Sequence, residues 1–75
     1  MEQLARDPDP QVRSVIASRR ACPEAVMQRL MTDGDERVRA RLAYNPGLPV
    51  DLLIQLASDP SALVAEGAMA RLRKP

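Results

Sequence analysis

Few side chains in this 75-residue sequence are able to act as nucleophiles, general bases or metal ligands. It has no histidine, and Cys22 is the only cysteine. Arg19 and Arg20 lie just before Cys22 and would lower the pKa of its thiol, which favours the reactive thiolate. Without histidine, however, neither a Ser–His nor a Cys–His pair is available. The alternative role for Cys22 is that of a small apolar residue packed in the core, as is common for free cysteines.

Acidic side chains come in pairs, at Asp7 and Asp9 and again at Asp33 and Asp35. Two carboxylates offer oxygen ligands to a hard cation, but such ions usually take about six or more oxygens. Each pair also lies where a helix is predicted to begin, and there a carboxylate caps free N–H groups and meets the positive end of the helix dipole. We therefore predict structural roles for these acids, with no metal, no cofactor and no catalytic residue.

Composition restricts the chain to one small domain with an aliphatic core. The apolar fraction is 45%, yet there is no Phe or Trp and one Tyr, which is typical of small packed helices. Eleven basic and ten acidic residues give a net charge of +1, so no strong field draws the chain to nucleic acid or anionic lipid. No window approaches the roughly 18 apolar residues of a membrane span. We expect a cytoplasmic protein without membrane contact.

The sequence repeats itself with a period of 26 residues. Leucine, aspartate, valine and proline recur in register, as Leu4/Leu30/Leu56, Asp7/Asp33/Asp59, Val12/Val38/Val64 and Pro23/Pro49/Pro75. In the same register Cys22 aligns with Leu48, which favours the packed role for the cysteine. A fixed period of this length predicts a helical-repeat array. We divide a single domain, residues 1–75, into units of approximately residues 4–29, 30–55 and 56–75.

Each unit is predicted to hold two short helices. The first begins at the repeated aspartate, with Asp7, Asp33 and Asp59 as N-caps, each followed by a proline or a glycine. The second begins at Pro23 and Pro49 and ends just before the next aspartate. Apolar residues three and four positions apart mark the buried face of each helix. No segment alternates apolar and polar residues for long, so strands are not expected.

Two stretches, residues 4–13 and 44–60, carry a resemblance to a known family. They show the pattern Leu-Ala-x-Asp-Pro, then Val-Arg, then Asn-Pro-x-x-Pro, then Leu-Leu. Over nearly its whole length the chain resembles the leucine-rich repeat variant family, a bacterial group similar in style to HEAT repeats. The resemblance implies an all-α solenoid, a right-handed superhelix of paired short helices in which one layer has 3₁₀ character. It implies no particular activity, because the family has no common one.

HEAT-type repeats also link an aspartate and an arginine six residues later into a ladder between neighbouring units. This spacing occurs in Asp7/Arg13 and in Asp33/Arg39. The third unit has Asp59 but no arginine six residues later, so the ladder is expected to end there.

Arginine and tyrosine side chains that the repeat does not require are the candidates for a binding surface. Arg37, Arg41 and Tyr44 are four and three residues apart, so they share one face of a helix. Both residue types are enriched at interaction hot spots. The alternative is an ordinary solvated helix face. Arg19 and Arg20 are further candidates, because they align with uncharged residues of the next unit.

These features predict a non-catalytic protein-interaction or scaffold module with an unidentified protein partner. The alternative is a nucleic-acid or phosphate-binding surface, in which Arg19 and Arg20 join Arg13 and Arg39 in a basic stripe. The near-neutral charge and the scarcity of aromatic residues argue against it. The sequence starts and ends partway through a unit, so we expect a fragment or an end of a longer array. Uncapped ends would favour self-association or docking onto a neighbouring domain.

Overall fold

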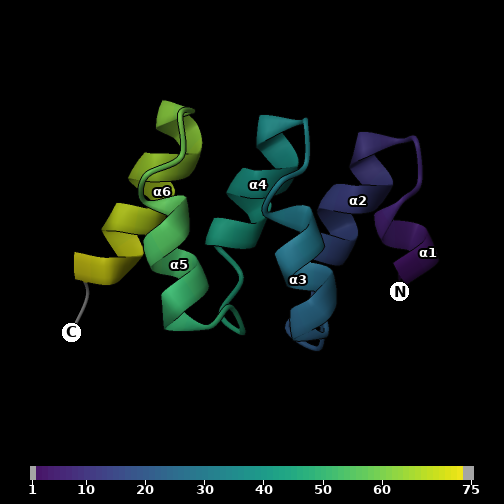
Figure 1. Cartoon of the computed structure of the whole chain (residues 1–75), viewed down its shortest axis with the longest axis horizontal. Coiled ribbons are helices and arrows are strands. Elements are labelled where there is room, and N and C mark those ends of the chain that lie inside the picture. Colours follow the sequence, from purple (N-terminus) through teal and green to yellow (C-terminus); the bar gives the residue numbers. More distant parts are fainter. Residues whose placement is uncertain (1, 74–75) are drawn as a thin grey trace.

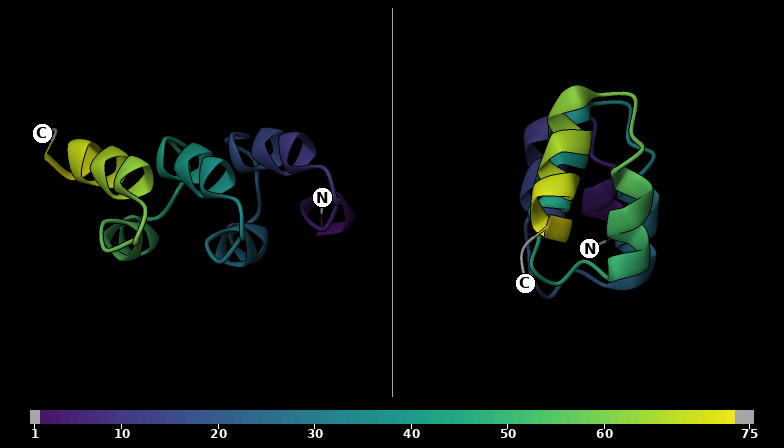
Figure 2. Two further views of the ribbon diagram at one scale, coloured as in Figure 1. Left: turned by 90° about the horizontal axis from the view of Figure 1, so that it is seen from above. Right: turned by 90° about the vertical axis from the view of Figure 1, so that its left-hand side faces the viewer.

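The computed structural model describes residues 2–73, and the regular secondary structure of this part of the chain is all helical. Its helices are α1 Glu2–Ala5, α2 Pro10–Ala17, α3 Glu24–Leu30, α4 Glu36–Ala43, α5 Val50–Leu56 and α6 Ala62–Arg73. Helices α2, α4 and α6 form one row, and α1, α3 and α5 form a second row beside it (Figure 1; Figure 2, left). The prediction of an all-α fold is confirmed.

Helix starts reproduce the period of the sequence. In the first row α2, α4 and α6 begin at residues 10, 36 and 62, and in the second row α3 and α5 begin at residues 24 and 50. Helix α4 packs between α2 and α6, and the molecule is elongated, with extents of 33 × 23 × 15 Å. Among residues 2–73, no helix is long and apolar enough to cross a membrane.

The core lies between the two rows and is built from aliphatic side chains. The largest fully buried apolar ones are Ile16, Val26, Met27, Leu30, Val38, Leu42, Leu56 and Val64. Leu30 and Leu56 project from the second row at equivalent positions, and Val38 and Val64 project from the first. Burying one such side chain contributes about 1.5–3 kcal/mol, and short helices of seven or eight residues depend on this packing for their stability.

Each first-row helix begins two residues later than predicted, so the N-cap assignment to Asp7, Asp33 and Asp59 is wrong. The N-caps of α2 and α4 are Asp9 and Asp35, whose side chains accept hydrogen bonds from the N–H groups two residues on, at 2.9 Å. The repeated aspartates form the turn before the helix instead. Each accepts an N–H bond two residues ahead, at 2.8–2.9 Å. Two consecutive Asx turns therefore lead into α2 and into α4, and one leads into α6.

Both rows are α-helical, so the 3₁₀ character that the resemblance implies for one of the two layers is not found within residues 2–73. The hydrogen bonds of α3 and α5 in the second row show this. In both helices N–H groups bond to carbonyls four residues back. Examples are Met27 N to Pro23 O at 3.0 Å and Leu53 N to Pro49 O at 3.0 Å. Bonds to the third residue back occur at the helix ends, for example Val26 N to Pro23 O at 3.0 Å, as is usual for short α-helices.

Candidate interaction surface

Two arginines connect successive units on one side of the array. The Nε and Nη2 atoms of Arg13 donate to the carboxylate of Asp33 at 2.7 and 3.1 Å. Arg39 binds Asp59 in the same way, at 2.8 and 3.2 Å. The remaining nitrogen, Nη1, donates to the backbone carbonyl of the aspartate in its own unit, Asp7 or Asp33. Each guanidinium thus spans two units, and the bidentate geometry is the strongest form of this ion pair.

These ladder pairs are shielded from water. The Arg39 and Asp59 side chains are 15% and 7% exposed. Burial by itself raises the pKa of Asp59, but the hydrogen bonds from Arg39 and from the Ser61 N–H outweigh it and hold that pKa below its usual range. The carboxylate therefore stays ionised beside its arginine. Each of the three guanidinium nitrogens of Arg13 and of Arg39 donates a hydrogen bond, so both arginines are used to join units.

A second connection between units was missed in the sequence. The side chain of Asn45 is buried, with 1% of its surface exposed. Its Nδ2 donates to the carbonyls of Ala17 and Arg19 at the end of α2, both at 2.8 Å, and its Oδ1 accepts from the Gly47 N–H at 2.8 Å. It thus satisfies the Ala17 carbonyl at the end of α2 and adds a second bond to the Arg19 carbonyl, which also accepts from the Cys22 N–H.

Arg71 occupies the position 26 residues after Asn45 and makes the equivalent connection. Its Nη1 donates to the carbonyl of Ala43 at 3.0 Å and to that of Asn45. The two side chains differ in chemistry but bind the same pair of carbonyls in successive units. The signal in the sequence was weak, because the aligned residues are Arg19, Asn45 and Arg71 and share no side-chain type.

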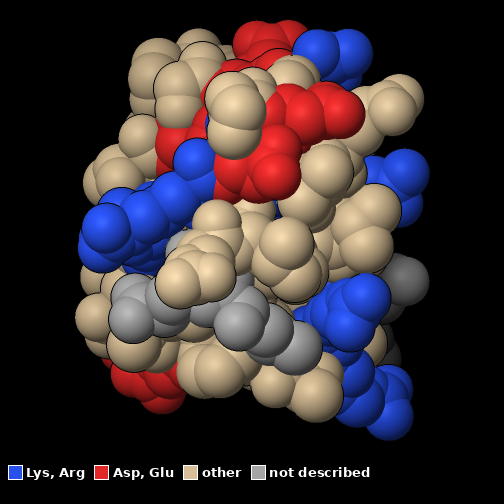
Figure 3. Space-filling view, turned by 90° about the vertical axis from the view of Figure 1, so that its right-hand side faces the viewer, with Lys and Arg blue, Asp and Glu red and all other residues tan. Residues whose placement is uncertain are grey.

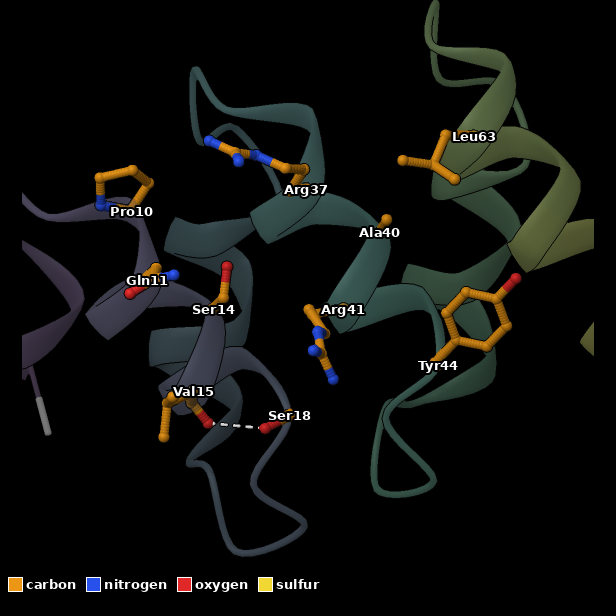
Figure 4. Close-up of a pocket in the computed structure, with 10 residues that line it drawn as sticks. All are labelled: Pro10, Gln11, Ser14, Val15, Ser18, Arg37, Ala40, Arg41, Tyr44 and Leu63. Atoms are coloured by element: carbon orange, nitrogen blue, oxygen red, sulfur yellow. Dashed lines mark hydrogen bonds between the residues drawn. The ribbon is translucent and has the colours of Figure 1, made fainter.

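A groove of about 530 Å³ crosses the first row of helices. We call it the Tyr44 groove. Its lining residues are Pro10, Gln11, Ser14, Val15, Ser18, Arg37, Ala40, Arg41, Tyr44 and Leu63 (Figure 4). They come from α2, α4 and α6, so the groove exists only where helices of successive units stand side by side. The structure thus brings the predicted Arg37, Arg41 and Tyr44 together in one hollow.

Tyr44 is the C-cap residue of α4, and its ring lies over Gly67 of α6. A Cβ atom at Gly67 would come within 3.1 Å of Cε2 and Cζ of the tyrosine ring. Because Gly67 has no side chain, the Tyr44 ring can lie directly against α6. Tyr44 remains 58% exposed. Tyr44 is therefore an aromatic side chain with one face packed against α6 and the rest open to a ligand.

The two arginines of the Tyr44 groove differ in their surroundings. Arg37 is paired with Asp35, with Nη2 to Oδ2 at 2.9 Å and Nε to Oδ1 at 3.2 Å. The side-chain hydrogen bond from Arg37, together with its backbone N–H, lowers the pKa of Asp35 to about 2. The Arg41 side chain has no hydrogen-bond or ion-pair partner within residues 2–73. Arg41 is therefore the guanidinium available in the groove.

The predicted residues Arg19 and Arg20 do not lie in the Tyr44 groove. They are exposed in the turn between α2 and α3, and neither side chain forms an ion pair within the described residues. The backbone there has a structural role, because a Cβ atom at Gly47 would come within 2.7 Å of the Arg20 carbonyl oxygen. This close approach of two successive turns requires glycine.

Charge on the α1 end of the molecule is divided into patches. Acidic side chains gather in the upper half of this face, and basic side chains lie in separate groups toward its edges (Figure 3). The pairing of Arg13 and Arg39 with aspartates also takes these two arginines out of the predicted basic stripe. On this face the arginines thus form no continuous cationic track.

The thiol of Cys22 is buried, and this burial raises its pKa. A raised pKa reduces the thiolate fraction, so the activation expected from the neighbouring arginines does not occur. Within residues 2–73, no three potential His, Cys, Asp or Glu ligands come together as a metal site. The carboxylate pairs instead cap helices and form turns.

Helix pairs that begin at equivalent positions make equivalent contacts with their neighbours. The family model of the leucine rich repeat variant matches residues 36–61, which include α4 and α5. The match supports the family predicted from the sequence, and it covers the segment that provides Arg37, Arg41 and Tyr44. No curated protein matches the chain, and no solved structure matches it either. The family is a structural repeat, so it specifies neither a reaction nor a partner.

Proposed function

We propose that the chain is a non-catalytic protein-interaction module, formed as an α-solenoid of three 26-residue units, that binds a segment of a partner protein in the Tyr44 groove. The contacts between units support the solenoid, because equivalent contacts occur at two successive junctions. They are the Arg–Asp ion pair and the side-chain hydrogen bonds from Asn45 or Arg71 to backbone carbonyls of the preceding unit. A continued array of this kind would curve as a right-handed superhelix. A cytoplasmic location suits a chain with one buried cysteine and no disulfide.

The observation that carries the functional proposal is the arrangement at Tyr44. An exposed tyrosine is supported by Gly67, beside the unpaired Arg41, in a hollow made by helices of successive units. Interaction hot spots are enriched in tyrosine and arginine and lie in pockets. A side chain that is already held in place loses little conformational entropy on binding, which favours affinity.

The nucleic-acid alternative is weaker because most well-placed arginines are already bound. Arg13, Arg39 and Arg71 connect units, and Arg37 binds its own N-cap aspartate. A phosphodiester chain needs several free cations along one track, and its binding would weaken steeply with salt. We therefore treat nucleic-acid binding as an outcome that the following experiment would reveal.

The test is affinity capture from the source cell extract with wild-type chain and two alanine variants, with and without nuclease. Tyr44→Ala removes the proposed contact. Ile54→Ala removes an equally exposed apolar side chain, 55% exposed, from α5 in the other row. We expect a nuclease-resistant protein that is retained by Ile54→Ala and lost with Tyr44→Ala. Capture that depends on nucleic acid, or that is lost with Ile54→Ala alone, would contradict the proposal.

A further inference from the structure

We infer that the Tyr44 groove selects a partner segment in which a carboxylate side chain lies next to an aliphatic one. The inference rests on the proposed function and adds the chemistry of the bound segment. It starts from the charges of the lining residues, which include two arginines and no aspartate or glutamate. The charged residues that line the groove are thus all basic, although the whole chain is nearly neutral.

Arg37 is already paired with a carboxylate of its own helix start. Its guanidinium binds both oxygens of Asp35, and the nearby Glu36 also stabilises its charged form. Arg41 has no such partner, so one guanidinium is left in the groove for an incoming anion. The planar fork of an arginine fits a carboxylate through two parallel N–H···O bonds. A single free cation suits one carboxylate group and does not suit a chain of phosphates.

Apolar side chains surround this cation. Val15 lies on the α2 side of the groove, and Leu63 and Tyr44 lie on the α6 side, with Arg41 between them (Figure 4). All three are exposed. The small residues Ser14, Ser18 and Ala40 leave room between the helices for a side chain to enter. An aliphatic residue placed there would cover these surfaces and gain about 25 cal/mol for each Å² of apolar area removed from water.

Together these features specify the occupant. A segment that carries an acidic and an aliphatic side chain on one face satisfies both the free guanidinium and the exposed apolar walls. A segment without the acidic side chain leaves Arg41 unpaired, and a segment without the aliphatic side chain leaves the apolar surface exposed to water. The charge contribution is modest, because pairs open to solvent are screened. Selectivity for glutamate over glutamine should therefore amount to about two- to fivefold in affinity.

The test uses isotope-labelled wild-type chain and three terminally blocked peptides, followed by NMR titration of backbone amides. The probe peptide is Gly-Ser-Leu-Glu-Glu-Leu-Gly-Ser. In the first control both glutamates are glutamine, and in the second both leucines are serine. We expect saturable shifts at residues 14–18 and 40–44 with the probe. The glutamine peptide should bind about two- to fivefold more weakly, and the serine peptide should bind more weakly than the probe.

Arg41→Gln assigns the charge preference to one side chain. In this variant the probe and the glutamine peptide should bind with equal affinity. Arg29→Gln is the matched control, because it removes an exposed arginine from α3 in the other row. Arg29→Gln should retain the difference between the two peptides. Retention of that difference in Arg41→Gln would overturn the assignment to Arg41.

The outcomes separate the inference from the function on which it rests. Equal binding of the glutamate and glutamine peptides to wild type, or no shifts in the groove with the probe, would overturn the inferred chemistry. In either case the proposed function would still stand if a captured protein is lost with Tyr44→Ala. If no captured protein depends on Tyr44, the proposed function itself is wrong.

Discussion

The arginines of this chain divide into those that hold the structure together and those that are free. Arg13 and Arg39 each bind an aspartate of the next unit and a carbonyl of their own, while Arg41 binds neither. The sequence spacing identified the first group through the resemblance to HEAT-type repeats. It placed Arg37 and Arg41 on one helix face, but the pairing of Arg37 with Asp35 emerged only from the structure.

Removing a ladder arginine should destabilise the fold strongly. Arg39→Ala leaves the shielded Asp59 carboxylate without its partner, and we expect a loss of about 3 kcal/mol in the free energy of unfolding, measured by urea denaturation. Arg29→Ala, at an exposed position on α3, should change that free energy by no more than about 0.5 kcal/mol. Equal effects of the two substitutions would show that the ladder does not contribute to stability.

Acid should weaken the fold through Asp35 and Asp59. The pKa of Asp35 is lowered to about 2, and that of Asp59 also lies below its usual range. Because the unfolded chain takes up these protons first, their stabilisation is complete above about pH 4 and declines as the pH falls toward 2. Thermal melting followed by circular dichroism between pH 5 and pH 2 measures this.

Asparagine variants provide the control for the acid effect. Asn also caps helices, so Asp35→Asn keeps the N-cap while removing the titrating group. The melting temperature of Asp35→Asn should therefore fall less than that of wild type between pH 4 and pH 2. Identical acid dependence in the two proteins would rule out a contribution from Asp35.

At the scale of the helices, the period of the sequence predicted which helices form better than it predicted the residues at which they begin. The second-row helices begin where Pro23 and Pro49 predict, but α2 and α4 begin after the second acid of each pair. Local rules allow either aspartate to cap, since Asp7-Pro8 and Asp9-Pro10 have the same pattern. Which aspartate caps the helix depends on the position of the turn before it, because this turn must bring Asp33 and Asp59 to the arginine of the preceding unit. That pairing is a tertiary contact, which local rules do not predict.

The sequence did not reveal the roles of Asn45, Arg71 and Gly67, and the physical reason is the same for all three. Asn45 and Arg71 reach carbonyls 26 and 28 residues away, and Gly67 matters only because Tyr44 lies over it. Such contacts depend on how neighbouring units approach each other. From the sequence alone, Gly67 is expected only to weaken its helix. In the structure it is the residue against which the exposed Tyr44 ring packs.

Gly67 and Tyr44 should therefore be energetically coupled. Gly67→Ala improves helix propensity by about 1 kcal/mol, but its Cβ would press on the tyrosine ring. In a Tyr44→Ala background that obstacle is gone, so the alanine should show its full stabilising effect. A double-mutant cycle by urea denaturation should give a coupling of about 1 kcal/mol. Additive effects would show that the ring does not rest on Gly67.

At the scale of the whole molecule, apolar side chains are exposed at both ends of the array. Leu4 is exposed on α1, and Met69 and Leu72 are exposed on α6. Because exposed apolar surface favours association, we expect the mass measured by light scattering to rise with protein concentration. Leu72→Lys should reduce that rise, while Gln28→Lys, at an exposed polar position on α3, should not. A constant monomer mass for wild type would contradict this expectation.

The central claim is that the partner binds across the first row of helices at Tyr44. The most direct test replaces Tyr44 with the photoreactive amino acid p-benzoylphenylalanine, and Ile54 in a parallel variant, and identifies the cross-linked products from cell extract by mass spectrometry. The two positions are 58% and 55% exposed, so they are equally open to random collisions. We predict a discrete protein adduct from position 44 that is absent from position 54. Adducts from position 54 alone, or with nucleic acid alone, would contradict the account.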